Sequence, residues 1–242
     1  MKSLFDARRR GMLFKRATDL LRRKAGIDYR KSYAQCGEDV IVRTVFDMLG
    51  IASPSYLDIG AHHPTFLSNT YLFYEQGCQG VTIEPDPELH ARFLDKRPRD
   101  VNLNIGVGPE PGSFELFIMS TRTLNTLSEP EANMYVSQGY RIDARHRVEV
   151  NTIGAVIDAH FKATPDFLSV DVEGLDYEIL QSLDPARHRP SVVCVETIVF
   201  SSTGKGEKRS EIDDLLLGRG YIRFADTYIN TIYVDEQSWI NR

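Results

Sequence analysis

Short apolar runs alternate with amphipathic stretches along most of this chain. The stretches between the runs have apolar side chains at helical spacing. Runs that resemble buried strands lie at 55–59, 80–84, 101–107, 167–172 and 191–197, and predicted helices lie at 69–76, 87–97, 153–161, 175–182 and 210–217. Strands that alternate with helices predict an α/β fold, in which helices cover both faces of a mostly parallel sheet.

Two regions depart from this alternation. Residues 113–119 alternate as a hairpin or edge strand does, and a short helix at 131–138 and a strand at 147–152 follow. At the C-terminal end, the strands predicted at 221–225 and 229–234 lie too close together for a crossover helix. We therefore expect these last two strands to pair antiparallel.

Composition and charge exclude several classes of protein. Hydrophobic residues make up 42% and charged residues 26% of the 242 residues, as in ordinary globular chains. No apolar run approaches the ~20 residues of a membrane-spanning helix. The net charge of −5 combines 11 basic and 3 acidic residues in 1–31 (+8) with 18 basic and 31 acidic residues in 32–242 (−13). The strong negative charge of residues 32–242 argues against nucleic-acid binding.

The basic arm, residues 1–31, is set apart from a single domain predicted over 32–242. Leu13, Ala17, Leu20 and Leu21 follow helical spacing, with Arg and Lys on the other side. This helix either contacts an anionic membrane or an acidic partner, or packs on its own domain. Without a secretory signal or a CxxC pair, the three cysteines indicate a cytoplasmic protein, which the arm would hold peripherally at the inner face of the membrane.

The residues that end the predicted strands indicate a cofactor, because ligands bind beyond the carboxyl ends of parallel strands. Gly60 permits a tight turn after the first strand, and Glu84 ends the second strand 24 positions later, near the spacing of an acid that binds ribose hydroxyls. The later glycines of GxGxxG are missing, so a cofactor without phosphate fits better than a dinucleotide. Asp58 suits an ammonium group, and S-adenosylmethionine combines these features.

Three motifs resemble one known family in order and spacing. They are the segment SYAQCGED at 32–39, the stretch YLDIGAHHPTFLSNTYLFYEQGCQGVTIEPDP at 56–87, and FLSVDVEGLDYEIL at 167–180. From about Ser32 to Val234 the chain resembles the FkbM-type S-adenosylmethionine-dependent methyltransferases. This resemblance implies a Rossmann-like, seven-stranded class I methyltransferase sheet with an antiparallel C-terminal edge strand. It also implies O-methylation of hydroxyls, typically on sugars in glycans or on glycosylated natural products.

The resemblance also implies roles for individual residues. Asp58 and Gly60 would line the methionine end of the cofactor, Glu84 with Pro85 would hold the ribose, and Asn104 and Ile105 would flank the adenine. The segment with Gln35, Glu38 and Asp39 would close over the pocket, although the same residues are also typical of a helix N-terminus. The turn departs from the family in having His62, His63 and Pro64 where a second glycine is usual.

The candidate bases for methyl transfer to a hydroxyl are Asp171, Glu173 and His63, because a positioned base must remove the hydroxyl proton. Asp171 and Glu196 end adjacent strands, an arrangement that resembles the Mg²⁺ site of catechol-type O-methyltransferases. In the alternative interpretation, Asp171 only orients the cofactor and Glu196 only hydrogen-bonds the segment 35–39. A nicotinamide-dependent sugar oxidoreductase and a non-catalytic scaffold that docks through its basic arm are the alternative functions.

Overall fold

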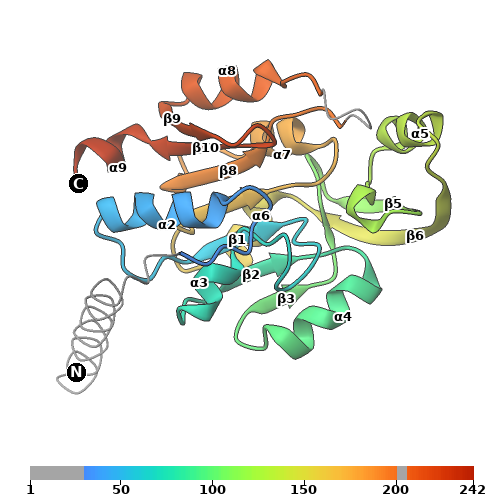
Figure 1. The fold of residues 1–242 in the computed structure, drawn as a ribbon, viewed down its shortest axis with the longest axis horizontal. Helices are drawn as coiled ribbons and strands as arrows, with labels where there is room; N and C mark the ends of the chain where they lie inside the picture. Colours follow the sequence, from blue (N-terminus) through green and yellow to red (C-terminus); the bar gives the residue numbers. More distant parts are fainter. Residues whose placement is uncertain (1–29, 201–205) are drawn as a thin grey trace. The chain divides into compact units, whose positions relative to one another are not determined.

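A seven-stranded sheet forms the centre of the computed structural model, which describes residues 30–200 and 206–242 (Figure 1). Six neighbouring pairs hold the sheet together. Its order is β3 (Val101–Leu103), β2 (Gly80–Ile83), β1 (Tyr56–Ile59), β7 (Phe167–Val170), β8 (Val192–Glu196), β10 (Asn230–Asp235) and β9 (Tyr221–Asp226). The first five strands run parallel, and β10 is antiparallel to both of its neighbours. The predicted fold class is confirmed, with the antiparallel strand one place inside the edge.

Helices cover both faces of this sheet, because the strands are apolar on both sides (Figure 1). Apolar side chains of α2 (Glu38–Met48) and α3 (Tyr71–Glu75) pack on one face. Those of α6 (Ile153–His160), α7 (Asp176–Ser182) and α8 (Ser210–Gly218) pack on the other face. The helix α4 (Pro87–Lys96) lies against β3, and α9 (Glu236–Ile240) follows β10 directly.

An inserted unit separates β3 from α6 and has a small core of its own. Its three strands, β4 (Gly106–Val107), β5 (Gly112–Met119) and β6 (Ile142–Asn151), form a second sheet in the order β4-β6-β5. Between β5 and β6 the chain forms the 3₁₀ helix η1 (Arg122–Leu124) and the helix α5 (Glu129–Ser137). Figure 1 shows β5, β6 and α5 at one end of the sheet.

The structure corrects three details of the predicted elements. The strand predicted at 101–107 is broken after β3, because the side-chain amide of Asn104 donates to the carbonyls of Glu84 (2.8 Å) and Pro85 (3.0 Å) and the chain then leaves for the second sheet. The strand β6 begins at Ile142, five residues before the prediction, because pairing with β5 stabilises a segment that is itself polar. The helix α9 was not predicted, and α2 was predicted only through its N-terminus, as the alternative interpretation of Glu38 and Asp39.

The ends of β1 and β7 meet closely at Gly60. This residue has a φ of 76°, and a Cβ atom built on it would lie 1.7 Å from the backbone oxygen of Asp171. The amides of Gly60 and Ala61 donate to the carbonyl of Ile83, and the amide of Asp171 donates to the carbonyl of Ile59. Only glycine fits here, since both the backbone conformation and the space exclude a side chain.

No helix in the described ranges is both long and apolar enough to span a membrane. The chain divides into two compact units, Met1–Lys31 and Ser32–Arg242, and both sheets belong to the second. The amphipathic helix predicted in the basic arm lies outside the described residues.

We predict that Gly60→Ala lowers the free energy of unfolding by more than about 3 kcal/mol, because the new Cβ atom adds a backbone clash to a conformation that itself costs about 1–2 kcal/mol for a non-glycine residue. Gly77→Ala is the matched control, since Gly77 has a φ of 91° and a Cβ atom added there would meet no other atom within 4 Å. Urea unfolding of both variants measures the difference. Equal losses for the two variants would contradict the contact between β1 and β7.

Candidate active site

A pocket lies beyond the carboxyl ends of β1, β2 and β7, where parallel sheets bind ligands. One wall consists of strand ends and the turns that follow them, and the other belongs to the inserted unit. The first wall includes Ile59, Gly60, His62, Ile83, Glu84, Pro85, Asp171 and Val172. The second includes Gly106, Val107, Leu116, Arg122, Thr123, Asn125, Thr126 and Leu127. The pocket therefore contains three predicted cofactor residues, Gly60, Glu84 and Pro85.

Glu84 is buried at the end of β2, with its carboxylate held by backbone amides. The amide of His62 donates to Oε2 and that of Asp86 to Oε1, each at 2.8 Å. Burial raises the pKa of Glu84 to about 8 despite these two hydrogen bonds. Each oxygen of a carboxylate has the capacity for a second hydrogen bond, so Glu84 remains able to accept from a bound hydroxyl.

Asn104 and Ile105 take different positions from Glu84. Asn104 is exposed and contacts the backbone of Glu84 and Pro85, so it supports this strand end. Ile105 is half-buried and packs against the main core. Neither lies in the lining of the pocket.

Asp58 also lies outside that lining, on the opposite side of β1. Its Oδ2 accepts a 2.5 Å hydrogen bond from the Thr70 hydroxyl and lies 4.0 Å from Nη1 of the fully buried Arg97. Burial raises the pKa of Asp58, and the Arg97 charge opposes this shift. The structure thus joins Asp58 to an internal polar network with Thr70 and Arg97, two residues before the turn at Gly60.

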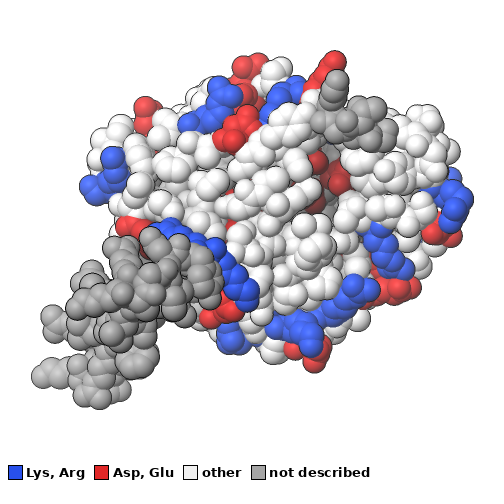
Figure 2. Space-filling view, in the orientation of Figure 1, with Lys and Arg blue, Asp and Glu red and all other residues white. Residues whose placement is uncertain are grey.

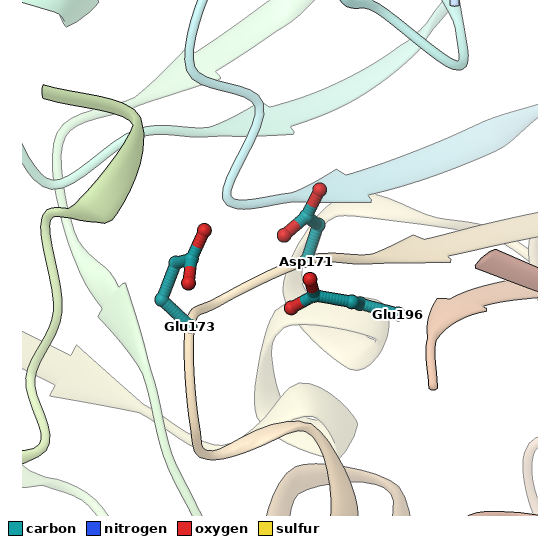
Figure 3. Close-up of side chains that lie close together, drawn as sticks. All are labelled: Asp171, Glu173 and Glu196. Atoms are coloured by element: carbon teal, nitrogen blue, oxygen red, sulfur yellow. The ribbon is translucent and has the colours of Figure 1, made fainter. Parts of the chain in front are cut away.

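Three acidic side chains converge beside the pocket, and they point toward one another from two adjacent strand ends (Figure 3). Asp171 and Glu173 follow β7, and Glu196 is the last residue of β8. One carboxylate oxygen of each lies within 4.8 Å of the other two. Within the described ranges, Asp171 and Glu196 have no hydrogen-bond or ion-pair partner for their carboxylates. We call these three residues the acidic cluster.

Burial and mutual repulsion favour the protonated forms of the acidic cluster. Burial raises the pKa of Asp171 to about 7, and the neighbouring charges of Asp176, Asp58 and Glu38 add to this. The pKa values of Glu173 and Glu196 are also raised, first by burial and then by the other acids. Carboxylates in this state bind either protons or a cation at neutral pH.

The turn after β7 has an unusual backbone that is held from several sides. Glu173 has a φ of 54° and Gly174 a φ of 109°. The Asp176 carboxylate accepts from the amides of Val172 (3.2 Å) and Gly174 (3.4 Å). From the inserted unit, Tyr135 donates to the Glu173 carboxylate at 2.5 Å. Asp176 and Tyr135 are site residues that sequence analysis did not identify in these roles, since the contact with Tyr135 spans 38 positions.

His63 is half-buried and lies outside the pocket lining, whereas its neighbour His62 is part of it. The Nδ1 atom of His63 accepts from the amides of Thr65 (3.2 Å) and Phe66 (3.1 Å). Burial, and then the charge of Arg92, lowers the pKa of His63. A neutral imidazole that accepts at Nδ1 carries its proton on Nε2, so in this geometry His63 presents a donor at Nε2.

The segment with Gln35, Glu38 and Asp39 forms the N-terminal end of α2. Glu38 is buried and accepts from the side chains of Thr227 (2.6 Å) and Asn230 (3.2 Å), which fixes α2 to β10. Asp39 accepts from the Ser32 hydroxyl and the Tyr33 amide. These contacts give both acids a structural role, and Gln35 is exposed outside the pocket lining.

Two arginines of the site lie at different ends of it. Arg122, in η1, donates to Asp86 (2.5 Å) and to Glu88 (2.7 Å), and thereby fixes the inserted unit to the segment after Glu84. Arg209 pairs with Glu131 at 3.3 Å, and its charge favours ionisation of Glu196. In the space-filling view most Lys and Arg side chains lie at the periphery, while acidic atoms appear in a central recess (Figure 2).

The sheet order, with one antiparallel strand between β8 and β9, is that of class I S-adenosylmethionine-dependent methyltransferases. The model of the Methyltransferase FkbM domain matches residues 58–223, more than half of the chain. The chain therefore belongs to the FkbM methyltransferase family, as the resemblance of its motifs predicted. A search of curated proteins found no match.

Solved structures of other methyltransferases are similar to this chain at low identity. Burkholderia thailandensis 1,6-didemethyltoxoflavin-N1-methyltransferase, with bound 1,6-didemethyltoxoflavin and S-adenosylhomocysteine, is 10% identical over 94% of this chain and 89% of its own, with a TM-score of 0.43. A TehB-like S-adenosylmethionine-dependent methyltransferase from Corynebacterium glutamicum is 10% identical over 91% and 97%, with a TM-score of 0.42. Synechocystis magnesium protoporphyrin IX methyltransferase, with bound S-adenosylmethionine, is 11% identical over 90% and 89%, with a TM-score of 0.37.

We predict that the free energy of unfolding of the ligand-free protein decreases as the pH rises from 5 to 8. The pKa of Glu84 is about 8 in the folded protein and about 4.3 in an unfolded chain, so between these values the folded state binds more protons. We expect a loss of at least about 1 kcal/mol by urea unfolding. Glu84→Gln makes this decrease shallower, whereas Glu110→Gln, at an exposed site, leaves it unchanged. The same slope in both variants would contradict the prediction.

Proposed function

We propose that this protein transfers a methyl group from S-adenosylmethionine to a hydroxyl oxygen, and that the acceptor hydroxyl belongs to a sugar in a glycan or glycosylated natural product. The observation that carries the proposal is the acidic cluster, which adjoins the cofactor pocket through Asp171. Membership of the FkbM family favours methyl transfer over the alternatives of a nicotinamide-dependent oxidoreductase and a non-catalytic scaffold.

On the cofactor side, Glu84 accepts hydrogen bonds from the ribose hydroxyls, and Gly60 lets the methionine end approach the backbone of the turn. Buried Glu84 already accepts one amide hydrogen bond at each oxygen, so its carboxylate has a fixed orientation before the cofactor binds. The network of Asp58, Thr70 and Arg97 fixes the side chain of Asp58 on β1, just before this turn. An ammonium group above this turn benefits from the acidic surroundings.

On the acceptor side, Asp171 is the base. It lies both in the pocket lining and in the acidic cluster, so it faces the cofactor and the acceptor together. The donor sulfonium is already activated, and the protein must mainly align the hydroxyl oxygen behind the methyl carbon and accept the proton. Alignment is worth about 7–11 kcal/mol, and a positioned base contributes about 10²–10⁴-fold.

Aromatic side chains near the acidic cluster support a sugar as the acceptor. Phe200 and Tyr140 are half-buried, with ring centroids 5.8 Å apart, and both pack against Tyr135, which contacts Glu173. Carboxylates accept hydrogen bonds from sugar hydroxyls, while aromatic rings offer a flat apolar surface to the ring of a sugar. The inserted unit and the chain after β8 would then form the acceptor side.

We further propose that Mg²⁺ binds to Asp171 and Glu196, with Glu173 as an additional ligand. Three carboxylates in close proximity, two of them without partners in the described ranges, fit a hard cation that prefers oxygen ligands. When bound, the ion lowers the pKa of a hydroxyl beside it. Asp171, Glu196 and Glu173 would hold the ion with their carboxylates, and Asp171 would remain the group that accepts the hydroxyl proton.

The basic arm fits the proposal that the protein works at the cytoplasmic face of a membrane. Its +8 charge attracts anionic lipids, at about 1 kcal/mol for each Lys or Arg near the surface. An acidic protein partner offers the same attraction.

We predict that Asp171→Asn lowers turnover at least about 100-fold, because the base is lost. Turnover is measured as S-adenosylhomocysteine release with a panel of sugar acceptors. Calorimetry with S-adenosylhomocysteine measures cofactor binding, which we expect to change by less than about fivefold, within about 1 kcal/mol. Asp95→Asn, at an exposed position of α4, is the control. Retained turnover in Asp171→Asn would rule out Asp171 as the base. A wild-type protein that binds no cofactor in calorimetry would refute the proposed function.

We predict that EDTA lowers turnover at least about tenfold, the effect of losing roughly 1.4 kcal/mol of transition-state stabilisation, and that added Mg²⁺ restores it. Mg²⁺ also raises the melting temperature of the ligand-free protein, since it binds the folded state. Glu196→Gln reduces both effects, whereas Glu110→Gln does not. Full turnover in excess EDTA would eliminate the Mg²⁺ site and leave the proposed base intact.

A further inference from the structure

Two side chains of the inserted unit hold the residue Glu173. The hydroxyl of Thr126 donates to the Glu173 carbonyl at 2.6 Å, and the hydroxyl of Tyr135 donates to Oε2 of its carboxylate at 2.5 Å. Tyr135 belongs to α5 and is 1% exposed. The backbone and the carboxylate of Glu173 are thus both fixed by a unit that lies outside the central sheet.

The backbone at Glu173 requires such support. Glu173 has a φ of 54°, a conformation that non-glycine residues rarely adopt, and it persists only where the surroundings enforce it. A Cβ atom built on the following residue, Gly174, would lie 2.2 Å from Cγ of Glu131, which also belongs to α5. The close packing of α5 on this turn therefore leaves Glu173 little freedom.

The acidic side chains around Glu173 repel its carboxylate. One carboxylate oxygen of Glu173 lies within 4.8 Å of a carboxylate oxygen of both Asp171 and Glu196. The nearby cation Arg209 pairs with Glu131 instead. The Tyr135 hydroxyl is the one described donor to the Glu173 carboxylate. Without it, repulsion within the acidic cluster favours rotation of the Glu173 side chain away from the other two acids.

Packing alone does not explain a tyrosine at position 135. Its ring contacts Phe200 at 5.3 Å and Tyr140 at 6.4 Å between centroids, and a phenylalanine would make the same contacts. A buried hydroxyl is costly unless it has a hydrogen-bond partner, and this one donates to Glu173. The hydroxyl of Tyr135 therefore serves the position of Glu173.

We propose that Tyr135 is a positioning residue for methyl transfer, which holds the Glu173 carboxylate in the acidic cluster against the repulsion of its neighbours. The proposal rests on the proposed function, in which the acidic cluster receives the acceptor. Tyr135 itself touches neither the cofactor pocket nor, in this assignment, the acceptor. Its removal therefore affects the reaction step more than the binding of either substrate.

Tyr135→Phe tests this proposal because it removes only the hydroxyl. S-adenosylhomocysteine release measures kcat and the acceptor KM, and calorimetry measures cofactor binding. We expect kcat to fall about 10–100-fold, with both binding constants within about threefold of the wild type. A kcat within twofold of the wild type, or a raised acceptor KM with unchanged kcat, would overturn the proposal.

Tyr233→Phe is the matched control. Tyr233 is likewise buried and donates its hydroxyl to a carboxylate, that of Asp213 at 2.6 Å. It lies three residues along β10 from Asn230, the residue opposite Glu196 on the neighbouring strand. Tyr233 is therefore further from the carboxyl ends of the parallel strands. If Tyr135 acts only through stability, the two variants lower kcat equally, which would refute the proposal. We expect a loss of kcat in Tyr135→Phe alone.

A double-mutant cycle shows whether Tyr135 acts through Glu173. In a Glu173→Gln background, adding Tyr135→Phe has little further effect on kcat if the two residues act together. Full additivity would overturn the proposal. S-adenosylhomocysteine release measures methyl transfer to any acceptor. Transfer to an amine in place of a hydroxyl would therefore refute the proposed O-methylation. In that case the ratio of kcat in Tyr135→Phe to kcat in the wild type still decides the role of Tyr135.

Discussion

The concentration of partly buried carboxylates at the ends of β7 and β8 is the constraint on which the site depends. Asp171, Glu173 and Glu196 repel one another, and burial makes each charge more costly. The fold keeps them together by fixing their backbones. The sheet sets Asp171 and Glu196 on adjacent strands, and Asp176 holds the turn between Asp171 and Glu173. Binding of a proton, a cation or hydroxyl donors at this site therefore relieves the repulsion among the three carboxylates.

The inserted unit connects the two halves of this site. Arg122 binds Asp86, two residues after Glu84 of the pocket lining, while Thr126 and Tyr135 bind Glu173 of the acidic cluster. The residues between these contacts form one wall of the pocket. The same short segment thus fixes both one wall of the pocket and the acidic cluster.

Much of the central sheet was predictable, because its strands are short apolar runs separated by amphipathic helices. The inserted unit was predicted less well, since β6 is polar and partly exposed and forms only by pairing with β5. Among the site residues, Gly60 and Glu84 were recognisable from their spacing. Asp58, Asn104 and His63 have hydrogen-bond partners that spacing does not reveal, and these partners place them outside the pocket lining.

The sequence by itself determined the α/β class, the antiparallel closing strands, the family and the strand ends that line the pocket, because these follow from local periodicity and from motifs in a fixed order. The sequence also predicted that Asp171 and Glu196 end adjacent strands, and only the tertiary structure decided that Glu173 meets them. Glu173 joins Asp171 and Glu196 because its backbone adopts a positive φ, and the hydroxyl that holds it comes from a helix 38 residues earlier. Contacts of this kind depend on how the inserted unit packs on the turn, and no local pattern encodes that packing.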